Sequence, residues 1–136
     1  MRKGFTLLEL IIVIIIIGVL ATLGFVQYSA VIEKARGAEA RAVISTLRSQ
    51  LAAKSMGGET AINSTALGIG AGIPSSCAAT NFFSYSIDTS CSTTTCTFIA
   101  TRCTSAGKTP NGSTSGTLTL SWTSGGTDTW ATNAGY

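Results

Sequence analysis

Two groups of residues in this sequence carry side chains that could do chemistry. The first is one carboxylate, Glu9, which is the only charge in the apolar run at residues 5–26. A carboxylate in hydrocarbon costs about 3 kcal/mol on insertion scales, so a run that keeps one needs a compensating group. The second is a set of four thiols in the second half of the chain: Cys77, Cys91, Cys96 and Cys103. The chemistry to consider is therefore charge pairing at Glu9 and oxidation or metal binding at the cysteines.

The composition argues against catalysis and against a bound metal. The chain contains no histidine, so it lacks the commonest general base and metal ligand. The cysteines are separated by 13, 4 and 6 residues, without a Cys-x-x-Cys pair, which makes zinc the weaker alternative to disulfides. After Glu59 the only carboxylates are Asp88 and Asp128, too few for a calcium loop. We expect no catalytic residue, no metal site and no cofactor.

The net charge is small once the start of the chain is set aside. Nine basic and six acidic residues give a formal charge of +3, and two of the basic residues, Arg2 and Lys3, precede the apolar run. Arg102 and Lys108 could contact phosphate, but two cations make a poor nucleic-acid site. We therefore expect no specific nucleic-acid site.

The hydrophobic pattern predicts the elements that position these residues. The run at residues 5–26 is long enough to span a bilayer, which needs about 20 apolar residues. Without a proline, the helical pattern continues to Gly57-Gly58, which we expect to end the helix. Residues recurring three or four apart predict the buried face of its second half: Val31, Ala35, Ala38, Ala42, Val43, Leu47 and Leu51.

A small antiparallel sheet is expected after the helix. The composition changes at Gly58 to serine, threonine and glycine, and three runs have the residue types of strands: 82–88, 95–102 and 117–123. We expect a sheet of three or four strands resting on the amphipathic helix half, with Trp122, Trp130 and Tyr136 in its core rather than in an exposed patch. The predicted fold class is α+β.

The cysteines are expected to form two disulfides outside the cytoplasm. Four cysteines permit three connectivities. If residues 82–88 and 95–102 form a hairpin, Cys77 faces Cys103 and Cys91 faces Cys96, whereas a Cys96–Cys103 bridge would join the two ends of one strand. We favour the nested pairs Cys77–Cys103 and Cys91–Cys96, with the other two patterns left open.

Three interpretations of the N-terminal segment compete. It could be a secretory signal peptide cleaved after Ala21, or a plain signal anchor oriented by Arg2 and Lys3 in the cytoplasm. It could also be cut between Gly4 and Phe5, after which the new amine would neutralise the carboxylate of Glu9.

The residues KGFTLLELIIVIIIIGVLATLGFVQY closely resemble the N-terminal signature of type IV pilins and of the pseudopilins of type II secretion. The matching features are the basic leader ending in Gly4 and the hydrophobic run that contains Glu9. Five individual residues match as well: Phe5, Thr6, Leu7, Gly18 and Tyr28. One position departs from the pattern, because Val26 stands where pilins usually have a proline. Only Gly18 and Gly24 then weaken the helix, by about 1 kcal/mol each relative to alanine.

The resemblance implies cleavage after Gly4 by prepilin peptidase and methylation of the Phe5 nitrogen. It implies a lollipop-shaped subunit with four parts: the leader (1–4), a membrane-spanning and filament-core helix half (5–26), an amphipathic half packed on the head (27–57), and a β-sheet head with two disulfides (58–136). The partners implied are other copies of the chain, the inner membrane, prepilin peptidase and the pilus assembly platform. The amine of Phe5 could pair with Glu9 of its own chain or of a neighbour, and the resemblance supports the neighbour, which makes Glu9 the residue that sets the assembly register.

The function expected is that of a structural, non-enzymatic subunit of a type IV pilus, used in surface attachment, twitching motility or DNA uptake. Such a subunit starts in the inner membrane and ends in an extracellular fibre. The first alternative is a pseudopilin, and the second is a membrane-anchored extracytoplasmic binding domain. Pseudopilins of the major type often bind calcium, so the scarcity of carboxylates after Glu59 favours the pilus subunit.

Overall fold

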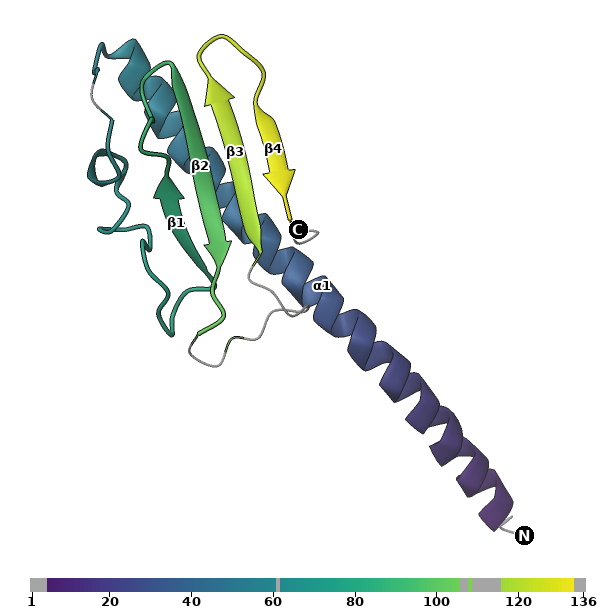
Figure 1. The fold of residues 1–136 in the computed structure, drawn as a ribbon. Coiled ribbons are helices and arrows are strands. Elements are labelled where there is room, and N and C mark those ends of the chain that lie inside the picture. The colour runs from purple at the N-terminus through teal and green to yellow at the C-terminus, as the bar shows by residue number, and fades with distance from the viewer. Residues whose placement is uncertain (1–4, 61, 106–107, 109–115, 134–136) are drawn as a thin grey trace. The chain divides into compact units, whose positions relative to one another are not determined.

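The computed structural model describes residues 5–60, 62–105, 108 and 116–133. The chain divides into two compact units, Met1–Ile32 and Glu33–Tyr136. The elements are one long helix, a short 3₁₀ helix (η1, Thr65–Leu67) and four strands, which confirms the predicted α+β class (Figure 1).

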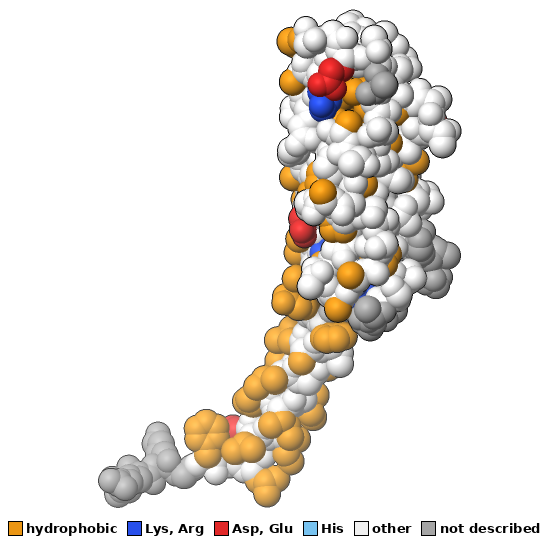
Figure 2. Space-filling view, turned by 90° about the vertical axis from the view of Figure 1, so that its left-hand side faces the viewer, with side chains coloured by type: hydrophobic (Ala, Val, Ile, Leu, Met, Phe, Trp, Pro, Cys, Tyr) orange, Lys and Arg blue, Asp and Glu red, His pale blue; other side chains and the backbone are white. Residues whose placement is uncertain are grey.

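The helix α1 runs from Leu7 to Met56. Its apolar part is long and hydrophobic enough to cross a membrane, and none of that stretch is buried against the rest of the chain. Figure 2 shows hydrophobic side chains gathered along it. Soluble monomers rarely expose a continuous apolar surface of this extent, so this part of the chain needs lipid or protein around it.

The helix continues through Val26 and ends where the sequence predicts. After Met56 the chain closes a Schellman motif: the N–H of Glu59 donates to the carbonyl of Lys54 (3.2 Å) and that of Gly58 to Ser55 (3.3 Å). Gly58 has φ 77°, a left-handed conformation that glycine adopts without strain. The glycine pair therefore ends the helix, as predicted.

The sheet contains β1 (Phe83–Ile87), β2 (Thr95–Arg102), β3 (Thr117–Thr123) and β4 (Thr129–Thr132) in that order, all antiparallel. The second and third predicted strands match the observed bounds, and the first was predicted one residue too long at each end. In β1 and β2, Tyr85 faces Ala100, which is the hairpin the disulfide argument assumes.

The core of the second unit lies between the sheet and the C-terminal half of α1, across which the strands lie in Figure 1. Alternate residues of β2 point inward, so Phe98 and Ala100 are fully buried, whereas Ile99 between them is only partly buried. They pack against the buried helix residues Ala40, Ile44, Leu47 and Leu51.

The predicted helix face was wrong in its first half. Val31 is 61% exposed, and Ala35, Ala38 and Ala42 are exposed as well, whereas Glu33, Gly37 and Ala40 are buried. An alanine methyl gains little from burial, so these alanines do not fix the rotation of the helix. Leu47 and Leu51, with far more apolar area, lie on the buried face as predicted.

The tryptophans divide between core and surface. Trp122 on β3 is buried, as predicted, but Trp130 on β4 is 38% exposed, which corrects the prediction. All four residues of β4, an edge strand that pairs only with β3, are exposed. Tyr136 lies outside the described residues.

Candidate site at the helix N-terminus

The first turn of α1 is closed by a reciprocal pair of side chains, Thr6 and Glu9. The carboxylate oxygen Oε2 of Glu9 accepts the backbone N–H of Thr6 at 2.9 Å and its hydroxyl at 2.8 Å. The hydroxyl oxygen of Thr6 in turn accepts the backbone N–H of Glu9 at 3.3 Å. This is a capping box, in which the N-cap residue and the third helical residue each satisfy a donor that the helix leaves without a partner.

The capping box gives Glu9 a position that the sequence analysis missed. The signal was present, since threonine followed three residues later by glutamate ahead of an apolar run is the motif's signature. The box turns the carboxylate back toward the start of the chain, next to the peptide that joins Phe5 to Thr6. A cation arriving at that point would meet a carboxylate already oriented by two hydrogen bonds.

The predicted cleavage junction between Gly4 and Phe5 precedes the helix in the sequence. Phe5 is 79% exposed and outside the helical backbone, whereas Gly4 falls outside the described residues. No salt bridge to Glu9 is present within residues 5–60, 62–105, 108 and 116–133. The negative charge sits at the helix N-terminus, where the helix dipole favours it.

A second charged cluster, within the second unit, joins the helix to the sheet. Arg102 of β2 and Glu33 of α1 form a two-pronged ion pair, with Nε to Oε1 at 2.5 Å and Nη2 to Oε2 at 3.2 Å. The Nη1 group of Arg102 donates to the carbonyl oxygens of Cys103 (2.6 Å) and Phe82 (3.2 Å), and Arg36 reaches Glu33 at 3.1 Å. Burial raises the pKa of Glu33, but the hydrogen bonds and charges of Arg102 and Arg36 outweigh it and leave that pKa below its usual value.

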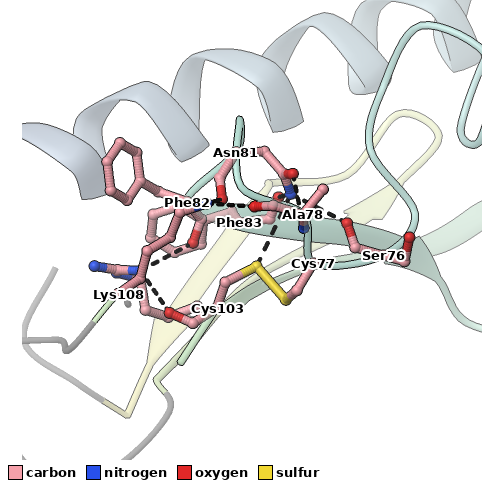
Figure 3. The surroundings of a disulfide bond; sticks show 9 residues. Ser76, Cys77, Ala78, Asn81, Phe82, Phe83, Cys103 and Lys108 are labelled. Carbon is pink, nitrogen blue, oxygen red and sulfur yellow. Dashed lines mark hydrogen bonds between the residues drawn. A yellow bond between two sulfur atoms is a disulfide. The ribbon is translucent and has the colours of Figure 1, made fainter. Parts of the chain in front are cut away.

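The two disulfides lie around the β1–β2 hairpin. Cys77 is bonded to Cys103 and Cys91 to Cys96, with Cα–Cα distances of 5.6 and 4.2 Å; these are the pairs that the hairpin argument favours. Beside the first bridge, the ammonium of Lys108 donates to the carbonyls of Ala78 and Asn81 (Figure 3).

Arg102 and Lys108, which could have contacted phosphate as exposed cations, instead bond to groups within the chain. The guanidinium of Arg102 is fully buried and engaged by Glu33 and backbone carbonyls, and the ammonium of Lys108 bonds two carbonyls. In the described structure these two cations therefore form contacts within the chain.

Two comparisons with known proteins bear on this site. Residues 1–25 match the family described as the prokaryotic N-terminal methylation motif. This match covers the predicted cleavage junction, the capping box and most of the apolar run. No solved structure matches the chain.

Proposed function

We propose that this chain, which carries the leader signature of type IV pilins and pseudopilins, is a structural subunit of a type IV pilus. The observation that carries the proposal is the methylation motif at residues 1–25 leading directly into a single helix that ends at Met56. Members of this family are structural subunits, and the motif together with the apolar helix fits a membrane-anchored precursor.

Assembly would begin with cleavage after Gly4 by a prepilin peptidase. In the uncut chain the nitrogen of Phe5 is an uncharged amide, whereas the cut chain carries an amine there, which stays basic after methylation. That amine would pair with Glu9 of a neighbouring copy, where the Thr6 cap holds the carboxylate in place. A buried charge without its partner costs about 3–5 kcal/mol, which favours the paired register over random sliding of apolar helices.

The membrane would hold the subunit until it polymerises. Arg2 and Lys3 would stay on the cytoplasmic side, and the apolar half of α1 would lie in the inner membrane. The head would then be outside the cytoplasm, where disulfides persist. In the fibre, apolar side chains of other copies would replace the lipid around the helix.

A pilus subunit is favoured over a pseudopilin by the chemistry of the head. Its two carboxylates after Glu59 already have partners, since Asp128 lies 2.9 Å from Nε of Arg48 and Asp88 accepts the hydroxyls of Ser90 (3.0 Å) and Thr89 (3.3 Å). They would have to give up these partners to bind calcium, the ion that pseudopilins of the major type often bind. The pseudopilin remains the second candidate, and an anchored binding domain the third.

Immunogold imaging of the natural host, with antibodies raised against the head, separates these functions. Long surface fibres labelled along their length support the pilus subunit. A secretion defect after deletion, without labelled fibres, supports the pseudopilin. A labelled cell surface with neither fibres nor a secretion defect supports the anchored binding domain.

A further inference from the structure

Lys34 and Glu39 stand apart from the other charged side chains that the structure describes. Neither forms a salt bridge, a hydrogen bond or a ring contact with another described residue, and Glu39 interacts only with the buried Tyr85, through its charge. Eleven others have such partners: Glu9, Glu33, Arg36, Arg41, Arg48, Lys54, Glu59, Asp88, Arg102, Lys108 and Asp128. One cation and one anion on α1 therefore have no bonded partner among the described residues.

These two side chains do not face each other within one chain. Five residues along a helix correspond to a rotation of about 140° and a rise of about 7.5 Å. Helical residues become neighbours at spacings of three and four, and not of five. Each charge is thus available to a partner outside its own chain.

The helix surface between the two charges is made of small residues. Ala35, Ala38 and Ala42 fall between Lys34 and Glu39 around the helix axis, and all three are exposed. Alanines allow the backbone of another helix to approach closely. Beside Glu39 lies a hollow of about 260 Å³ whose lining includes Val43, Phe82 and Tyr85. Its aromatic rings would suit the methylene stem of a lysine whose ammonium reaches the carboxylate.

We propose that Lys34 of one copy pairs with Glu39 of the next copy across this alanine face. The proposal rests on the proposed function, in which identical subunits repeat along a fibre. A contact between two different surfaces of the same subunit generates an open helical array, in which each interior copy uses both surfaces once. One unpaired cation and one unpaired anion on opposite sides of the same helix face meet that requirement.

Charge reversal tests the pairing in the natural host. The variants are Lys34→Glu, Glu39→Lys and the double variant, in the full-length chain, and the readout is the ratio of sheared fibre to membrane-bound subunit. Lys54→Glu is the matched control: it changes the charge equally but breaks a local bridge to Glu59 near the end of α1. Thermal unfolding of each detergent-solubilised subunit measures whether the variant folds. We expect the variants at residues 34 and 39 to unfold near the wild-type temperature, because both side chains are exposed and have no bonded partner among the described residues.

Each single reversal should lower the fibre ratio about fivefold or more, because it replaces an attraction by a repulsion at every contact along the fibre. The double variant should return to within about twofold of wild type, and Lys54→Glu should stay near wild type. Single variants with normal yield, or a double variant as poor as the singles, would overturn the pairing while leaving the pilus function intact. A wild-type chain that enters no fibre would contradict both proposals.

Discussion

The carboxylate of Glu33 on α1 is held in a buried two-pronged ion pair by Arg102, 69 residues further along the chain on β2. This pair ties the helix to the sheet at the inner face of the head. Of the two side chains, that of Arg102 is fully buried and that of Glu33 is 8% exposed. Both charges are therefore largely removed from water and depend on each other.

Removing one partner of this pair should be far worse than removing both. Arg102→Met leaves the Glu33 carboxylate with only the partly exposed Arg36, and we expect a loss of about 3–5 kcal/mol in the free energy of unfolding. The double variant Glu33→Leu with Arg102→Met should be much closer to wild type, because apolar groups of similar size often replace a buried pair at little cost. Urea unfolding of the detergent-solubilised subunit measures this. Equal losses in the single and double variants would show that the charges do not act as a pair.

The same pair predicts a pH dependence of stability. The pKa of Glu33 is lower in the folded chain than its usual value, so the folded state binds this proton less readily than the unfolded state. The stabilisation is thus fully present above the unfolded pKa of about 4.3 and is lost as the pH falls through the lower folded value. Thermal unfolding between roughly neutral pH and strong acid should show this fall, and Glu33→Gln should flatten it. An unchanged acid slope in that variant would assign the effect to other carboxylates.

The disulfide connectivity can be determined on the protein isolated from cells. Non-reducing peptide mapping should give one peptide pair joined by Cys77 and Cys103 and another by Cys91 and Cys96. A peptide joined by Cys96 and Cys103 would contradict β2 as an extended strand, since these residues lie at its opposite ends.

The capping box and the charge of Glu9 can be separated by substitution. Glutamine can still cap the helix but carries no charge, so Glu9→Gln should insert in the membrane and yet enter fibres poorly, as should Glu9→Val. Thr6→Ala keeps the charge and loses the hydroxyl, and we expect it to retain more fibre than either. The measurement is sheared fibre relative to the membrane pool. Normal fibre yield in Glu9→Gln would mean that capping, and not charge, is what assembly requires.

Much of the fold could be predicted from local sequence. The predictions that were wrong concern positions that are set by contacts between residues far apart in the chain. The length of α1, its glycine end and the β1–β2 hairpin follow from periodicity and turn residues. The rotation of the helix about its axis does not follow from periodicity, because burying the methyl groups of the alanines at residues 35, 38 and 42 contributes little free energy. What draws Glu33 inward is Arg102, at an inward-facing position of β2, and a contact this distant along the chain leaves no local pattern. The exposure of Trp130 likewise depends on where β4 is placed in the sheet, which the local sequence does not specify.

The features of the candidate site also differ in whether the local sequence predicts them. The Thr6–Glu9 box is local and could have been predicted from its spacing. The proposed partner of Glu9 after cleavage and the proposed pairing of Lys34 with Glu39 both involve another copy of the chain. Both therefore need measurements on the assembled protein.

The most direct test of the pilus account is the intact mass of the subunit in sheared fibres, with sequencing of its first residues. The account predicts a chain that starts at Phe5, has lost residues 1–4 and carries one added methyl group on its first nitrogen, as the motif at residues 1–25 implies. A chain that starts after Ala21 would contradict the account, because the helix half that holds Glu9 and most of the apolar run would be missing.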